Sequence, residues 1–167
     1  MNLLVTSSPH IHSGRTTSRL MADVLLALIP AVLAGCYFFG LRAAILMVVS
    51  IASCKIAEFL CCAVRRQPHP LRDCSAAVTG LLLALTLPVS VPYWVPVVGG
   101  FFAMIVVKGL GGGLGQNTFN PALAARALLV LLFPAVMTRF APVGTAISSA
   151  SMSVDMVSAA TPLHHMV

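Results

Sequence analysis

Charged side chains are scarce in this sequence. Asp, Glu, Lys and Arg make up 8% of its 167 residues, and 59% of the residues are hydrophobic. Soluble domains typically carry about 25% charged residues, and the mean hydropathy here is +0.98. This composition excludes an ordinary soluble domain and predicts a membrane protein.

The sequence also lacks the pattern of a cleavable leader and that of a cysteine metal site. Residues 1–19 are mostly polar and the first apolar run begins at Leu20, so we expect the first span to stay in the mature chain. The five cysteines show no C-x-x-C spacing and mostly lie in apolar runs, which favours small core residues. His164 and His165 predict no metal pair, because adjacent residues rarely converge on one ion.

Apolar runs long enough to cross a bilayer core divide most of the chain. Backbone polar groups in lipid must pair internally, so each run is most simply a helix. Pro88, Pro92 and Pro96 interrupt the long run after Ser75, which makes the third span short enough to be a half-helix. We therefore predict an all-α, polytopic membrane protein with about five transmembrane helices. A cytoplasmic segment (1–19) precedes a membrane domain (20–139) with spans at 20–41, 43–64, 76–91, 93–108 and 121–138, followed by an external segment (140–167).

Two further expectations concern a proline and four glycines within these spans. Pro121 falls at the first turn of the fifth span, where its missing N–H costs nothing. Small residues allow helices in lipid to approach closely. We expect this role for Gly35, Gly80, Gly99 and Gly100.

Basic residues on the connections predict the orientation. One side of the membrane receives six of them and the other side two: Arg15, Arg19, Arg65, Arg66, Arg72 and Lys108 against Arg42 and Arg139. The positive-inside rule then places the N-terminus in the cytoplasm and residues 140–167 outside. The net charge of +6 is explained by these positions, so no nucleic-acid partner is predicted.

Three ionisable residues inside the spans are candidates for a site. Lys55 and Glu58 stand at i and i+3, which lets them pair on one helix face. Such a pair serves an ion path, subunit docking or the structure alone. Arg126, one turn into the fifth span, meets the phosphate of a bound cofactor or a neighbouring subunit, or it snorkels to the interface.

The connection before the fifth span is rich in glycine and then in polar residues. Residues 108–121 read KGLGGGLGQNTFNP. No Gly-Lys-Ser/Thr follows the glycines, so a phosphate loop is rejected. The glycines suit a tight turn, whereas Gly115, Asn117 and Asn120 supply donors and acceptors that a turn does not require, and we consider them contacts for a cofactor or subunit.

The C-terminal residues 155–162, DMVSAATP, resemble the segment that a flavin transferase reads when it links FMN through its phosphate to a threonine. Thr161 supplies the acceptor hydroxyl, and the small Ala160 before it allows the transferase to approach. Asp155 suits the Mg2+ that accompanies a phosphate, and Ser158 completes the pattern. Read alone, a loop of this composition is more often only a loop.

Five blocks in this order resemble one family: SSPH at 7–10, Arg-x-x-Ser-Arg-x-Met from Arg15, GLLLALTLP at 80–88, GGLGQNTFNPA at 112–122 and SAATPL at 158–163. They are similar to the RnfD subunits of Rnf electron-transport complexes and to their relatives, the NqrB subunits of sodium-translocating NADH:quinone oxidoreductases. The resemblance implies a bacterial inner-membrane subunit with covalent FMN on Thr161, and further a non-covalent flavin. It also implies the other Rnf-type subunits, a flavin transferase and membrane lipid as partners, and coupling to Na+ or H+ transport.

Two departures from the family pattern are visible. Family members are about twice as long and resemble two five-helix repeats of opposite orientation, so this sequence corresponds to one half. Ala159 stands where the transferase pattern more often has another small residue such as glycine. The competing interpretations are half of a transporter or channel without a redox role, and a nonfunctional remnant.

Overall fold

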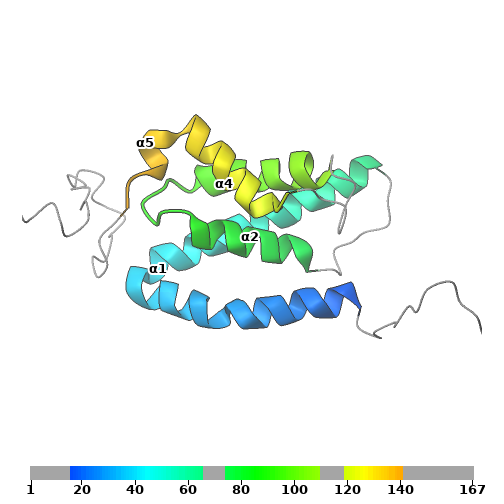
Figure 1. Cartoon of the computed structure of the whole chain (residues 1–167), viewed down its shortest axis with the longest axis horizontal. Coiled ribbons are helices and arrows are strands. Elements are labelled where there is room, and N and C mark those ends of the chain that lie inside the picture. Colours follow the sequence, from blue (N-terminus) through cyan, green and yellow to red (C-terminus); the bar gives the residue numbers. More distant parts are fainter. Residues whose placement is uncertain (1–15, 66–73, 110–118, 141–167) are drawn as a thin grey trace, which may run out of the picture.

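The structure, a computed structural model, describes residues 16–65, 74–109 and 119–140. Figure 1 shows its helices, coloured by their position in the sequence. They are α1 (Thr17–Arg65), α2 (Ser75–Thr86), α3 (Trp94–Phe101), the π-helix η2 (Phe102–Lys108), α4 (Pro121–Leu132) and α5 (Pro134–Met137). Every regular element among the described residues is a helix, which confirms the all-α prediction for that part of the chain.

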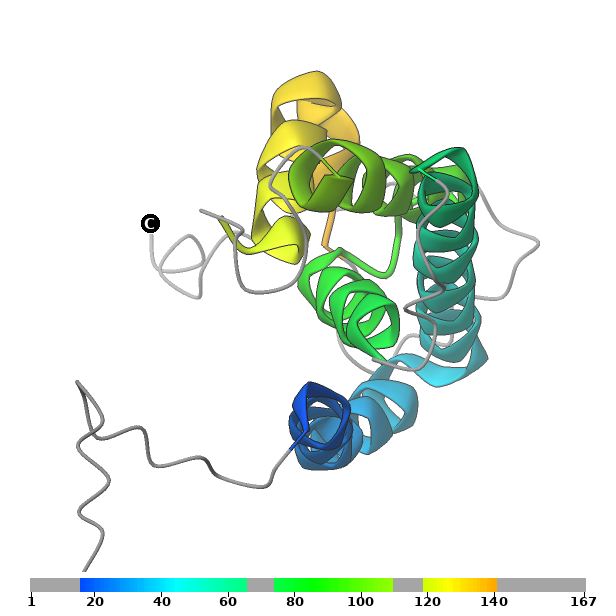
Figure 2. The same ribbon diagram turned by 90° about the vertical axis from the view of Figure 1, so that its right-hand side faces the viewer.

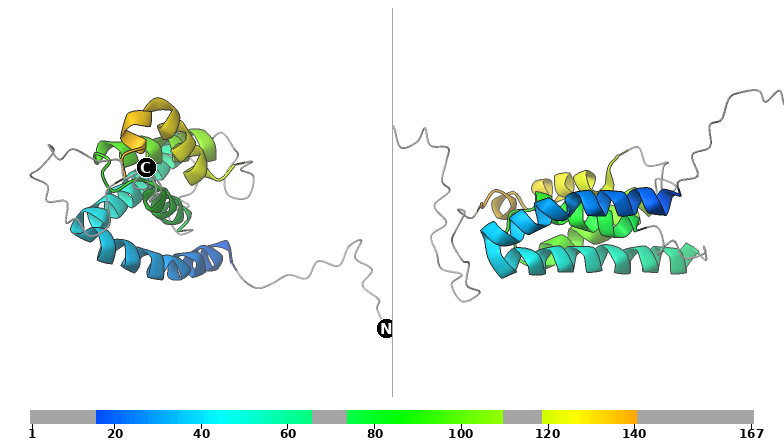
Figure 3. Two further views of the ribbon diagram at one scale, coloured as in Figure 1. Left: turned by 60° about the vertical axis from the view of Figure 1, so that its left-hand side comes forward. Right: turned by 90° about the horizontal axis from the view of Figure 1, so that it is seen from below.

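Helix α1 consists of two helices that meet at Gly40. This residue has φ +67° and ψ −157°, a conformation that side-chain-bearing residues rarely adopt. The chain reverses there, and the two halves of α1 run antiparallel as a hairpin (Figures 1 and 3). The reversal falls next to the predicted boundary between residues 41 and 43.

The remaining helices are shorter than the predicted spans, and prolines explain two of their ends. Helix α2 ends at Thr86 because Leu87 precedes Pro88 and is extended, with φ −86° and ψ 146°. Its 12 residues measure roughly 18 Å, against a bilayer core of about 30 Å. Helix α4 ends at Leu132, because the next residue, Phe133, precedes Pro134 and leaves the helical conformation. Pro121 stands in the first turn of α4, as predicted.

Among the described residues, one helical segment, Thr17–Val64, is long and apolar enough to cross a membrane by length and composition, and it contains the Gly40 reversal. The other apolar helices, Ser75–Thr86, Trp94–Lys108 and Pro121–Leu132, are shorter. The count of five transmembrane spans therefore stays a prediction.

The helices pack around α2. Seen end-on, α2 lies between the α1 hairpin on one side and α3, η2 and α4 on the other (Figure 2). Large, fully buried side chains come from α2 and from the layer of α3, η2 and α4: Leu83 of α2, Met104 of η2 and Leu129 of α4. The first half of α1 exposes many apolar side chains, among them Leu26, Leu33 and Tyr37.

Glycines allow the closest helix contacts, as predicted. A Cβ atom added to Gly80 would lie 2.7 Å from the Cα of Ile51 on α1. One added to Gly99 would lie 2.8 Å from the Leu129 side chain on α4, and one added to Gly100 would lie still closer to the hydroxyl oxygen of Ser53 on α1. At Gly35 the nearest atom is the flexible tip of Met47, at 3.1 Å. The Gly80 contact is the least adaptable because both partners are backbone.

Gly80→Ala should destabilise the protein by about 1–3 kcal/mol, since the added methyl group forces α1 and α2 apart. Gly35→Ala is the matched control, because Met47 can move its terminal methyl group away. Thermal unfolding of both purified variants in detergent measures the difference. Equal stabilities would contradict the close approach of α1 and α2.

Candidate functional site

A buried polar cluster joins three segments at one end of the bundle. Glu58 on α1 is 5% exposed and forms an ion pair through Oε1 with Nζ of Lys108, the last residue of η2. Lys108 also donates a hydrogen bond to Oγ of Ser75, the first residue of α2, at 2.7 Å. Ser75 Oγ in turn donates to Glu58 Oε1 at 3.5 Å. The carboxylate is thereby neutralised within protein, as a charge in an apolar layer requires.

The predicted pairing of Lys55 with Glu58 is wrong. Both residues lie on α1, but Glu58 is buried and Lys55 is exposed. The ion partner that the structure gives to Glu58 is Lys108, 50 residues later. A spacing of i, i+3 allows contact only when both side chains turn to the same side, and Glu58 turns into the bundle. A role of Lys55 or Glu58 in an ion path stays a prediction.

A second polar network closes the opposite end of α2. Arg42, which follows the Gly40 reversal, donates from Nε to the carbonyl of Val89 at 3.0 Å and from Nη2 to that of Ser90 at 3.1 Å. Its guanidinium carbon lies 5.7 Å from the ring centroid of Tyr93. Ser90 Oγ donates to the carbonyl of Arg139. Arg42 and Lys108 therefore lie at opposite ends of α2, as alternate connections require; which end faces the cytoplasm stays a prediction.

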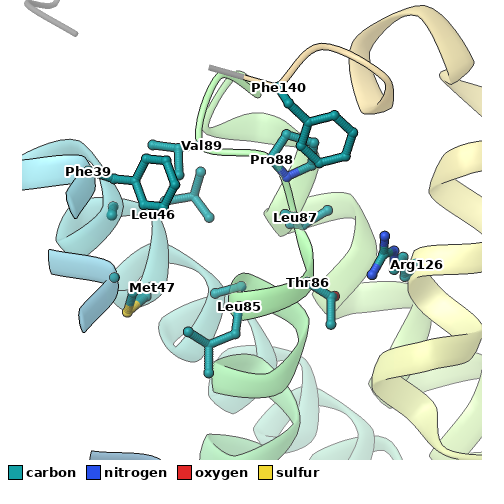
Figure 4. A pocket seen from close by; sticks show the side chains of 13 residues that line it. Phe39, Leu46, Met47, Leu85, Thr86, Leu87, Pro88, Val89, Arg126 and Phe140 are labelled. Atoms are coloured by element: carbon teal, nitrogen blue, oxygen red, sulfur yellow. The ribbon is translucent and has the colours of Figure 1, made fainter. Parts of the chain in front are cut away.

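Arg126 lines a cavity between α1, α2 and α4. The cavity has a volume of about 390 Å3 and is otherwise lined mainly by apolar residues. Figure 4 shows Arg126 on the α4 side, Thr86 and Leu87 at the end of α2, and Phe39 and Leu46 opposite. Phe140, the last described residue, also lines it. Whether Arg126 meets a flavin phosphate or a neighbouring subunit, or snorkels to the interface, stays a prediction.

Asn120 has a structural task in the described part of the chain. Its side-chain oxygen accepts a hydrogen bond from the Ala122 N–H at 3.0 Å and caps the N-terminus of α4. Its predicted contact with a cofactor or subunit stays a prediction. Six other predicted site residues lie outside the described residues: Gly115, Asn117, Asp155, Ser158, Ala160 and Thr161.

Sequence reasoning missed Ser75, and it counted Lys108 and Arg42 only as charges on connections. A usable signal existed for Lys108. Glu58 stands seven residues before the end of α1 at Arg65, and Lys108 ends the π-helix on the same side. The predicted order of the spans therefore placed Lys108 on the same side as Glu58, as a second possible ion partner besides Lys55. No local pattern pointed to the bonds between Arg42 and the carbonyls that follow α2.

The model of the NQR2, RnfD, RnfE family matches residues 4–167, nearly the whole chain. The chain belongs to this family. The sequence resemblance to RnfD subunits is thereby confirmed. The blocks that carried it run from residue 7 to residue 163, which is within the matched range.

Curated members of the NQR2, RnfD, RnfE family resemble the chain over most of its length. It is 42% identical over 163 residues to the D subunit of the Na(+)-translocating ferredoxin:NAD(+) oxidoreductase complex of Acetobacterium woodii. This match covers 98% of the present chain and 49% of the relative. It is 45% identical over 144 residues to the D subunit of the ion-translocating oxidoreductase complex of Aliivibrio salmonicida, covering 85% and 41%. The corresponding protein of Psychromonas ingrahamii is 38% identical over 184 residues, covering 95% and 53%. The chain thus spans about half the length of the curated relatives it matches.

Glu58→Gln and Lys108→Met should each destabilise the protein by about 3–5 kcal/mol, because each leaves the other group buried without its ionic partner. The double variant should recover much of this loss. Lys55→Met is the matched control and should change stability by less than about 1 kcal/mol, since Lys55 is exposed. Thermal unfolding of the purified protein in detergent gives all four values. A larger loss for Lys55→Met than for Lys108→Met would restore the i, i+3 pairing.

Proposed function

We propose that this chain is the flavin-carrying part of an RnfD-type subunit in an Rnf-type ion-translocating oxidoreductase of the bacterial inner membrane. The observation that carries the proposal is the 42% identity over 163 residues to a relative named as the D subunit of such a complex. The all-helical, apolar bundle agrees with a membrane role. As one component of a translocase, the chain acts within the complex and is inactive alone.

Thr161 is the proposed attachment point of the cofactor. Its hydroxyl would form the phosphoester with FMN, and the bound flavin would supply electron transfer in steps of one or two electrons. Asp155, Ser158 and Ala160 would be read by the flavin transferase during attachment and need no role in turnover. The support is the order of these residue types in the sequence.

The bundle's own side chains would hold the flavin-bearing segment in place and link the chain to its partners. The Glu58–Lys108 pair fixes η2 against α1 and α2, so the glycine-rich connection after Lys108 starts from a rigid point. Gly115, Asn117 and Asn120 on that connection would then contact a non-covalent flavin or another Rnf-type subunit. The exposed apolar side chains on the first half of α1 suit membrane lipid or a partner helix. Electron flow would be coupled to Na+ or H+ transport by the whole complex.

Thr161→Val should abolish covalent flavin while the protein still inserts into the membrane, because valine keeps the shape but lacks the hydroxyl. The measurement is the yellow, ultraviolet-fluorescent band after denaturing electrophoresis, scaled to the amount of protein. Asp155→Ala should lower the flavinylated fraction more than the amount of protein. A fluorescent band from Thr161→Val would move attachment to another hydroxyl, and a dark band from the unaltered protein would favour a transporter half without a redox role.

Membrane topology gives an independent test, because flavin transfer of this kind acts on exported segments. A reporter active only in the periplasm should give signal when fused after Arg139 and none when fused after Arg66. This expectation rests on the distribution of basic residues between the two sides. Signal after Arg66 alone would reverse the orientation and place Thr161 where the transferase does not act.

A further inference from the structure

The cavity beside Arg126 combines an apolar lining with one cation. Phe39, Leu46 and Met47 of α1 and Leu85 of α2 form one side, and Arg126 of α4 stands on the other (Figure 4). Its volume of about 390 Å3 is within the range of small-molecule and cofactor sites, about 300–1,000 Å3. Such a lining suits a flat apolar group that is anionic at one edge.

Arg126 needs an anion that the described part of the chain does not supply. Glu58 is already paired with Lys108 at the far end of α2, and no described residue forms an ion pair or hydrogen bond with the Arg126 side chain. Arg126 is the sixth residue of the 12-residue α4, so it lies away from both ends of that helix. A charge at this depth is expensive in lipid and marks a site with a counter-charge.

We propose that this cavity receives the isoalloxazine ring of the FMN tethered at Thr161, with Arg126 against the pyrimidine edge of the ring. The inference rests on the proposed function. When the oxidised ring takes up two electrons and one proton, the proton binds N5 and one negative charge stays on the N1 and O2 edge. A cation at that edge stabilises the reduced form and raises the flavin's reduction potential. In the test below, dithionite supplies the electrons and is oxidised to sulfite.

The path of the chain favours this occupant. Phe140 lines the cavity and stands 21 residues before Thr161. A fully extended segment of that length would span up to about 70 Å. The chain between Phe140 and Thr161 is therefore long enough for a flavin on Thr161 to reach the cavity. An anionic phospholipid fits less well, because its phosphate stays at the headgroup level while Arg126 lies halfway along α4.

The test uses the whole complex, purified with the unaltered chain or with Arg126→Gln, Arg126→Lys or Arg139→Gln. Arg139→Gln is the matched control, since it removes one exposed cation that does not line the cavity. Arg126→Gln should keep its covalent flavin and lower the equilibrium constant for reduction at least tenfold. That change is a drop of about 30 mV in midpoint potential for two electrons. Arg126→Lys should recover most of it, and Arg139→Gln should leave the potential unchanged.

A second variant tests the cavity without touching the charge. Thr86→Leu enlarges a lining residue, and the flavin fluorescence should then be quenched more strongly by iodide because the ring is displaced. Absence of covalent flavin in the unaltered complex would reject the proposed function itself. With flavin present, an unchanged potential in Arg126→Gln, equal shifts in Arg126→Gln and Arg139→Gln, or unchanged iodide quenching in Thr86→Leu would each overturn the docking of the ring. Lost stability with an unchanged potential would instead assign Arg126 to a carboxylate elsewhere in the complex.

Discussion

Glu58 is a carboxylate inside an apolar helix bundle, and lipid offers it neither water nor a counterion. Lys108 and Ser75 supply what is missing, and in doing so they fix the end of η2 and the start of α2 against α1. The Gly80 contact lies on the same α1–α2 interface and brings the two backbones together. The positions of α2 and η2 therefore depend on one charge having a partner from a distant part of the chain.

The same arrangement leaves room at the other end of α2. Because α2 stops at Thr86, its last turn and the residues up to Val89 form part of a cavity wall instead of continuing a helix. The hairpin of α1 and the side of α4 close the remaining walls. The short helix α2 is therefore held by ionic contacts at its N-terminal end and borders the cavity at its C-terminal end. Arg126 supplies the positive charge in the cavity lining.

Features that depend on local chemistry were predictable from the sequence. Gly40 lies next to the predicted first boundary, Pro88 ends α2, and Pro121 opens α4. The partner of Glu58 was not predictable from spacing, since helix rotation decides whether Lys55 or Lys108 meets the carboxylate. The cavity was equally hidden, because it brings together Phe39, Thr86, Arg126 and Phe140, which are far apart in the sequence. Residues such as Thr161, whose proposed role is chemical attachment, were found by motif alone.

Arg42 has a consequence for the order of assembly. Arg42 follows the Gly40 reversal. The carbonyls that accept its hydrogen bonds belong to Val89 and Ser90, which lie 47 and 48 residues later in the sequence. During synthesis, which proceeds from the N-terminus, the α1 hairpin is therefore complete before the two carbonyl acceptors of Arg42 are added to the chain. When α2 and the following turn arrive, the guanidinium satisfies two carbonyls that no helix uses. Arg42, at the turn of the α1 hairpin, thus binds the segment after α2 once that segment has been synthesised.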